Sequence, residues 1–304
     1  MRAIVTGASG FLGVNLVNTL LDLGWDVLAV VRPNSKNMSR LSKNENLRII
    51  ELDISDISAL SGIVSERFDA FFHFAWSGIR GKDRNDLVLQ ESNFINSQNA
   101  VQTAFDLGCT VYVSSGSQAE CGITNEVITE QTPMNPVCEY GKAKVRSLNY
   151  VADFCCSHGM KFIWARIFSL YGIMDYENSL INYALNQMLE DKQVKLSPCT
   201  QLWDFLNVCD ACYAIVLAIQ SNLNGVVNIA SGSPRVLKEF ILEMKSITNS
   251  HSELLFGAIP TPESGLVSLC PDVSLLKLHT NFVPKIDFKS GICKLIAFKL
   301  KGKI

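Results

Sequence analysis

Tyr140 and Lys144 are two side chains whose types and spacing suit proton transfer. Early on a helix, residues four apart share a face and lie about 6 Å apart along the axis. A lysine ammonium in that place favours the phenolate, so we expect Lys144 to lower a tyrosine pKa that is about 10 in water. A tyrosine tuned in this way can act as a general acid or base.

A serine-rich segment offers a second chemical group. It runs from Ser114 to Gly122 and follows an apolar stretch that reads as a strand. A serine hydroxyl at the carboxyl end of a strand can donate to a substrate oxygen while Tyr140 moves the proton. Ser115 and Ser117 are both candidates from position alone. A turn rich in small polar residues, without any chemistry, is the alternative.

A glycine turn near the start of the chain suits a phosphate-bearing ligand. Gly7, Gly10 and Gly13 follow the apolar run at residues 3–5 and open a helical pattern. Glycines in that place let the backbone approach a pyrophosphate, whose charge the helix N-terminus favours. The Gly-x-x-Gly-x-x-Gly spacing meets only half of the generic dinucleotide fingerprint. A plain strand-turn-helix without a ligand is the alternative.

The elements that must position these groups alternate through the first half of the chain. Besides the first apolar run, strands are expected at residues 26–31, 48–52, 70–74, 110–114 and 161–167, with the clearest helices at 92–107 and 140–157. Strands separated by helices indicate a parallel sheet covered on both faces. We therefore predict an α/β, doubly wound (Rossmann) sheet with ligands at the carboxyl ends of its strands.

The second half of the chain is less regular. We expect helices at 178–190 and 210–220, a short strand at 194–196, and a strand at 226–229 that could rejoin the sheet. The prediction is a dinucleotide-binding Rossmann domain formed by residues 1–172 plus 202–232. A smaller C-terminal α/β lobe, formed by 173–201 plus 233–304, is expected to bind the substrate.

Composition excludes several classes of function. The net charge of −2 gives no reason to expect nucleic acid or an anionic membrane as partner. No apolar run approaches the roughly 20 residues of a membrane span, and the first strand starts too near Met1 for a secretory signal. The ten cysteines are scattered and include no C-x-x-C pair, so we expect reduced thiols, no metal site and a cytoplasmic location.

Together these motifs resemble the extended short-chain dehydrogenase/reductase family, in particular its NAD(P)-dependent nucleotide-sugar epimerases, dehydratases and reductases. The resemblance extends over nearly the whole chain. It is carried by Thr6–Gly13, Asp53-Ile54, His73–Trp76, Asn93, Ser117, Tyr140 with Lys144, and Arg166–Gly172.

The resemblance implies a role for each matched residue. The catalytic set is Ser117, Tyr140, Lys144 and Asn93, in which Ser117 is preferred to Ser115 and Asn93 supports the helix that carries Tyr140. Substrate is expected at Ser117, Gln118, Arg80 and Trp203. The implied cofactor residues are Gly7, Ser9, Gly10, Phe11, Leu12, Gly13, Arg32, Asp53, Ile54, Phe74, Ala75, Trp76, Asn93, Tyr140, Lys144, Phe168, Ser169 and Leu170.

The end of the second strand discriminates between cofactors. An acid there accepts the ribose hydroxyls of NAD, whereas an arginine nearby accommodates the 2′-phosphate of NADP. Here Val31 takes the acid's usual place and Arg32 follows it, which favours NADP(H) and leaves NAD(H) as the alternative. A surface arginine without a cofactor role is the other interpretation.

The reaction expected is reduction or epimerisation at C4 of a nucleotide-activated deoxysugar. A 4,6-dehydratase would carry an Asp-Glu pair where this chain has Gln118 and Ala119. The diphosphate arginines of the family are also missing, since Trp203 stands in one place and Pro260–Glu263 holds no arginine. The nearest cations that could hold the diphosphate instead are Arg80, Lys82 and Arg84, in the loop after the fourth strand. The alternative is that these three side chains belong to a charged, solvated loop without a ligand.

Other interpretations therefore stay open. The substrate could be a different small carbonyl compound, or the chain could be a non-catalytic NAD(P)-binding regulatory or scaffold protein. A homodimer through the helices at 92–107 and 140–157 is common in the family.

Overall fold

The computed structural model describes residues 1–261 and 267–301 and has a seven-stranded parallel sheet at its centre. The strand order is β12-β7-β5-β4-β1-β2-β3, so the chain reverses its direction of winding between β1 and β4. This confirms the predicted doubly wound α/β fold. The strands are β1 (Arg2–Thr6), β2 (Asp26–Val31), β3 (Leu47–Glu51), β4 (Ala70–His73), β5 (Val111–Ser117), β7 (Lys161–Ile167) and β12 (Gly225–Ile229).

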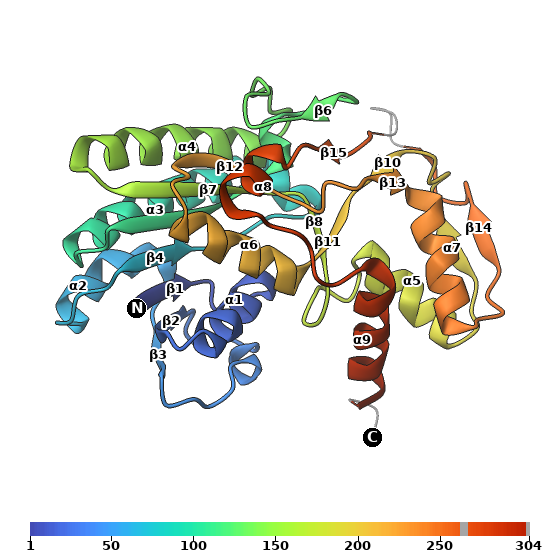
Figure 1. Ribbon diagram of the computed structural model, residues 1–304, viewed down its shortest axis with the longest axis horizontal. Helices are drawn as coiled ribbons and strands as arrows, with labels where there is room; N and C mark the ends of the chain where they lie inside the picture. Colours follow the sequence, from blue (N-terminus) through green and yellow to red (C-terminus); the bar gives the residue numbers. More distant parts are fainter. Residues whose placement is uncertain (262–266, 302–304) are drawn as a thin grey trace.

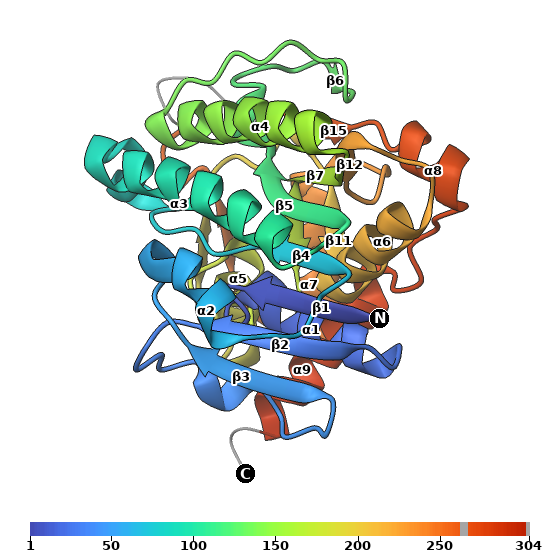
Figure 2. The same cartoon turned by 90° about the vertical axis from the view of Figure 1, so that its left-hand side faces the viewer.

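Helices cover both faces of this sheet (Figures 1 and 2). Successive strand residues point to opposite faces, so Ala3 and Val5 join one apolar core while Ile4 joins the other. The first core includes α1 (Phe11–Asp22) and α6 (Val208–Gln220), and the second includes α2 (Leu60–Ile63), α3 (Leu87–Asp106) and α4 (Glu139–His158). Burial on both faces explains why the central strands β1, β2 and β4 consist mostly of apolar residues.

A smaller lobe lies beside the carboxyl ends of the strands, on the right of Figure 1. It contains α5 (Leu180–Leu189), α7 (Leu237–Thr248) and α9 (Phe288–Lys301), with β9 (Val194–Leu196) paired to β14 (Leu254–Phe256). These elements share an apolar core of their own that includes Leu185, Ile241 and Ile292.

Short elements connect the lobe to the sheet. β8 (Ser169–Tyr171) pairs with β11 (Phe205–Asn207), β10 (Leu202–Trp203) with β13 (Arg235–Val236), and β6 (Val127–Ile128) with β15 (Cys270–Pro271). The described residues also contain the 3-10 turns η1 (Met38–Arg40), η2 (Ile54–Ala59), η3 (Gly81–Asn85) and η4 (Gln118–Glu120).

The structure differs from expectation at two helices. The helix predicted at 92–107 begins at Leu87, because the Asp86 side chain accepts a hydrogen bond from the Leu89 amide and caps it. α8 (Ser274–Thr280) lies within the predicted lobe, but Leu276 and Phe282 pack into the sheet core beside α6. This part of the predicted lobe therefore covers the Rossmann sheet.

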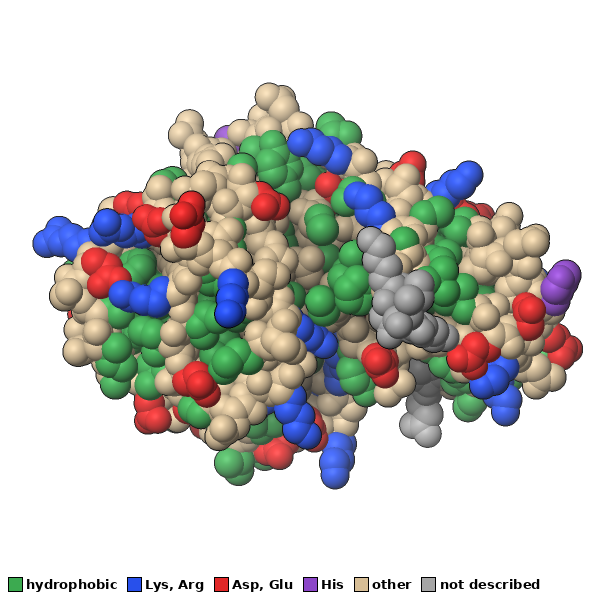
Figure 3. Space-filling view, turned by 90° about the horizontal axis from the view of Figure 1, so that it is seen from below, with side chains coloured by type: hydrophobic (Ala, Val, Ile, Leu, Met, Phe, Trp, Pro, Cys, Tyr) green, Lys and Arg blue, Asp and Glu red, His purple; other side chains and the backbone are tan. Residues whose placement is uncertain are grey.

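The surface shows no single dominant charge on the face drawn in Figure 3, where Lys and Arg side chains are interspersed with Asp and Glu. Within residues 1–261 and 267–301, no helix is both long and apolar enough to cross a membrane. The same residues contain no group of three or more His, Cys, Asp or Glu side chains placed to hold a metal ion.

Candidate active site

A cavity of about 630 Å³ opens at the carboxyl ends of the central strands, where the winding of the sheet reverses. Parallel sheets of this kind bind ligands at that point. The glycine turn, the end of β5, the start of α4 and the segment after β7 all reach this cavity. The predicted residues that line it are Gly7, Gly10, Phe11, Leu12, Gly13, Phe74, Trp76, Arg80, Tyr140, Lys144, Phe168, Ser169 and Leu170.

The glycine turn is shaped by close backbone contacts. Gly7 has a φ of +68°, and a Cβ there would lie 2.7 Å from the carbonyl carbon of Phe74 and the amide of Ala75. Only glycine therefore lets the loop after β4 lie against the turn. Gly10 is the N-cap of α1 and makes no side-chain cap, so the first amides of the helix face the cavity without a capping oxygen. This arrangement fits a pyrophosphate.

The serine turn after β5 is held by a buried carboxylate. Glu120 is fully buried, and its Oε1 accepts hydrogen bonds from the Ser117 amide at 2.6 Å and from Trp164 Nε1 at 2.9 Å. Its Oε2 accepts from Arg166 Nε at 3.0 Å. Ser117 in turn accepts from the Ala119 amide, which completes a capping box. We missed Glu120 as a positioning residue, although Ser-x-x-Glu after a strand is the sequence signal for this motif.

Helix α4 packs directly on this turn. A Cβ at Gly141 would lie 2.6 Å from the Ala119 carbonyl oxygen and 2.9 Å from Pro136 Cβ. The absence of a side chain therefore brings the helix start, with Tyr140, up to the Ser117 turn. Tyr140 is 8% exposed and lines the cavity.

Lys144 lies at the bottom of the cavity and is 1% exposed. Its Nζ donates to the Ser115 carbonyl oxygen at 2.6 Å and lies 3.4 Å from the centre of the Trp76 ring. Burial lowers the pKa of Lys144 to about 7, although the Glu120 carboxylate acts in the opposite direction. The lysine therefore loses its proton near neutral pH.

The predicted lowering of the tyrosine pKa is wrong in this arrangement. Burial raises the pKa of Tyr140 to about 12, although hydrogen bonding with Ser117 and the charge of Arg84 act to lower it. Lys144 Nζ lies 5.8 Å from the Tyr140 ring centre and is bonded to Ser115 instead. At neutral pH the Tyr140 phenol keeps its proton and is a donor.

Asn93 lies on the expected helix, but its hydrogen bonds differ from the role that the resemblance implies. Its Nδ2 donates to the Ser77 carbonyl oxygen at 2.8 Å and to Gln90 Oε1 at 3.1 Å, and its Oδ1 accepts from the Ser77 amide at 3.0 Å. Gln90 Oε1 also accepts from Trp76 Nε1 at 3.0 Å. These bonds fix the loop that carries Trp76, and none of them reaches the helix that carries Tyr140.

The loop after β4 brings two arginines to the cavity. Arg80 lies 3.7 Å from the Asp175 carboxylate and stacks on Tyr176, with 4.5 Å between its Cζ and the ring centre. Arg84 Cζ lies 4.8 Å from the centre of the Tyr140 ring. Lys82, the third cation of this loop, is exposed and lines no cavity that includes these arginines.

Several predicted residues do not line this cavity. Ser9 bonds to Ser35, Asp53 caps η2, and Arg32 is exposed. Ile54 and Ala75 are half-buried and are not among the residues that line the cavity. The wall contains Ser115 and Gly116 in place of the preferred Ser117.

Gln118 and Trp203 line an adjoining pocket of about 200 Å³. Asn37 and Arg40 line the main cavity and were missed, because no motif marks them in the sequence.

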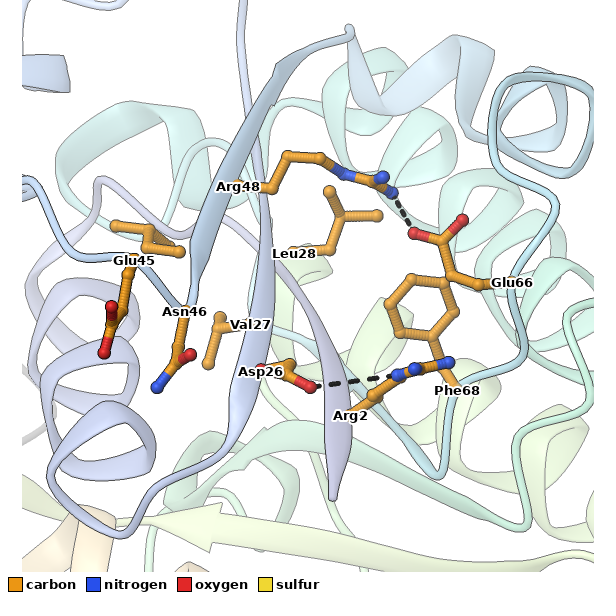
Figure 4. A pocket seen from close by; sticks show the side chains of 10 residues that line it. Arg2, Asp26, Val27, Leu28, Glu45, Asn46, Arg48, Glu66 and Phe68 are labelled. Atoms are coloured by element: carbon orange, nitrogen blue, oxygen red, sulfur yellow. Dashed lines mark ion pairs between the residues drawn. The ribbon is translucent and has the colours of Figure 1, made fainter.

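Another cavity, of about 290 Å³, lies at the amino ends of β1, β2 and β3 (Figure 4). Its cations are paired, since Arg48 lies 2.5 Å from Glu66 and Arg2 lies 3.8 Å from Asp26. None of the predicted site residues lines it. The predicted site residues that line a cavity therefore lie in the cavity of about 630 Å³ and its adjoining pocket, and not here.

Known proteins that resemble this chain act on nucleotide sugars. The model of the NAD dependent epimerase/dehydratase family matches residues 3–230. The chain is 29% identical over 258 residues to a dTDP-6-deoxy-L-talose 4-dehydrogenase (NAD(+)) of Aggregatibacter actinomycetemcomitans, covering 80% of this chain and 90% of that protein. It is 24% identical to a putative UDP-glucose 4-epimerase of Methanocaldococcus jannaschii, covering 96% of each.

Solved structures share the fold. The UDP-glucose 4-epimerase of Thermotoga maritima, crystallised with UDP-glucose, superposes with a TM-score of 0.90 at 22% identity over 100% of both chains. MoeE5, in complex with UDP-glucuronic acid and NAD, superposes with a TM-score of 0.85 at 22% identity, covering 99% of this chain and 100% of that one.

Replacing Lys144 by methionine should stabilise the protein at neutral pH and below, because a buried ammonium is costly. The native lysine loses its proton near pH 7 and the unfolded one near 10.5, so the natural chain becomes more stable as the pH rises between these values. The advantage of Lys144→Met should be constant below about pH 7 and shrink above it. Urea unfolding between pH 6 and 9 measures this, with the exposed Lys142→Met as control. A variant less stable than the natural chain at pH 6 would contradict the interpretation.

Proposed function

Since the chain belongs to the NAD dependent epimerase/dehydratase family, we propose that it is a nucleotide-sugar reductase or epimerase acting at C4. The observation that carries this proposal is the meeting of Tyr140 and Lys144 with the glycine turn in one cavity. Relatives with C4 chemistry on nucleotide sugars, such as the talose dehydrogenase and the putative epimerase, support it.

The residues divide the work as follows. A nicotinamide cofactor held by the glycine turn would accept or supply the hydride. Tyr140, protonated at neutral pH, gives its proton to the C4 oxygen during reduction and takes it back in the reverse direction. Lys144 holds the Ser115 carbonyl, and the buried Glu120 fixes the Ser117 turn beside the tyrosine.

The two positions after Ser117, where a dehydratase of this family would carry Asp-Glu, hold no carboxyl group. Gln118 and Ala119 follow Ser117, and Glu120, the next acid, is fully buried and bonded to Arg166. Reduction or epimerisation therefore remains the better interpretation.

We infer NADP(H) as the preferred cofactor. Arg32 directly follows β2, is exposed and forms no ion pair with any described residue, so its guanidinium is free to meet a 2′-phosphate. Arg40 adds a second cation in the cavity wall, and residues 31–36 contain no carboxylate.

We also propose that residues 1–172 plus 202–232 hold the cofactor and that 173–201 plus 233–304, apart from α8, bind the substrate. A homodimer through α3 and α4 is supported by the exposed apolar side chains Val88, Ile95 and Phe105 of α3. We expect a cytoplasmic protein.

A second candidate function is the reduction of a different small carbonyl compound. Trp203, in the pocket beside the main cavity, favours it, because an indole there supplies no charge for a diphosphate. Turnover of simple ketones and of 4-keto nucleotide sugars with NADPH separates the two.

Tyr140→Phe should abolish turnover while cofactor binding is retained, because the variant keeps the ring and loses only the proton donor. Turnover is measured by NADPH oxidation with a panel of 4-keto nucleotide sugars, and cofactor binding is measured by titration with NADPH. Tyr150→Phe, on the same helix outside the cavity, should behave as the natural chain. Unchanged turnover of Tyr140→Phe would refute the assignment.

NADPH should bind more tightly than NADH, and Arg32→Ala should remove most of this preference. Because the 2′-phosphate loses one charged hydrogen-bond partner, the Kd of NADPH should rise about tenfold, whereas the Kd of NADH should change little. Fluorescence titration of both cofactors measures it, with Lys43→Ala as an exposed control. Tighter binding of NADH to the natural chain would contradict the prediction.

A further inference from the structure

Arg84 lies at the junction of two neighbouring pockets. It lines both the cavity of about 630 Å³ and the adjoining pocket of about 200 Å³, and no other described residue lines both. It comes from η3, in the loop after β4, and is half-buried. A ligand that extends from Tyr140 into the smaller pocket therefore passes its guanidinium.

The smaller pocket is mostly apolar. Ile128, Val137, Trp203 and Leu269 supply apolar surface, and Gln118 supplies an amide. Arg84 is the charged member among the described residues that line it. Trp203 faces the same pocket and supplies no cation, so any negative charge that enters depends on Arg84.

The guanidinium has no carboxylate partner in the described part of the chain. Its contacts are the Cys138 sulfur at 3.4 Å and the face of the Tyr140 ring at 4.8 Å. Arg80, by contrast, is paired with Asp175, and Arg166 with Glu120. A partly buried cation without a counter-ion carries a desolvation cost that an anionic ligand would offset.

We propose that Arg84 binds an oxyanion group of the substrate at the junction of the two pockets. The planar guanidinium suits two oxygens of one group, such as a carboxylate on the sugar or a phosphate of the nucleotide. The inference rests on the proposed function for the identity of the substrate, and on the geometry for the anion. Arg84 is thus the residue that selects an anionic sugar or holds the diphosphate.

The test uses the full chain loaded with cofactor and measures binding by calorimetry. The probes are UDP-glucose, UDP-glucuronate and inorganic pyrophosphate, with the natural chain, Arg84→Met and the control Lys82→Met. Lys82 lies in the same loop, is exposed and lines neither pocket. Melting temperatures of the three proteins verify that each remains folded.

Loss of a charged hydrogen-bond partner predicts that Arg84→Met raises the Kd about tenfold or more. If only UDP-glucuronate weakens, Arg84 binds the sugar carboxylate; if all three probes weaken, it binds the diphosphate. Lys82→Met should match the natural chain in both cases.

Two results would overturn the proposal: Arg84→Met binding every probe within twofold of the natural chain, or the natural chain binding none of them. Failure of the proposed function gives a different result, in which neither nucleotide sugar is turned over while pyrophosphate binding still depends on Arg84.

Discussion

The buried carboxylate of Glu120 holds the site together. One side chain accepts hydrogen bonds from the Ser117 amide at the end of β5 and from Trp164 and Arg166 on β7. Both partners of the Glu120–Arg166 ion pair are fully buried, so each depends on the other for its charge to be tolerated. The pair therefore fixes the ends of two neighbouring strands at the place where the cavity begins.

The rest of the site is built outward from that pair by close contacts that need glycine. Gly116 leaves room for Trp164 and Glu120, since a Cβ there would lie 2.8 Å from Glu120 Oε1. Gly141 then lets α4 lie on the turn and present Tyr140 to the cavity. Burial of the tyrosine and lysine follows from this packing. Burial raises the pKa of Tyr140 and lowers the pKa of Lys144, because it disfavours the charged form of each group.

The sequence predicts what depends on local pattern and misses what depends on distant partners. The strand at 26–31 and the strand at 161–167 were predicted to the residue, because each is a mostly apolar run of strand length, although the second also contains the buried Arg166. The spacing of Tyr140 and Lys144 placed both in the cavity, yet it carried no information on burial, so the direction of the tyrosine pKa shift was wrong. The bonds of Asn93 to Ser77 cross between a helix and a loop, and no local pattern reveals them.

Unfolding of Glu120→Gln by urea tests most directly whether the buried pair holds the site. Glutamine keeps the shape of the side chain but removes the charge opposite Arg166. Leaving one member of a buried pair uncompensated should lower the unfolding free energy by about 3–5 kcal/mol, whereas the exposed Glu126→Gln should leave it nearly unchanged. Turnover should fall with it, because the Ser117 turn loses its anchor. An unfolding free energy equal to that of the natural chain would contradict this account.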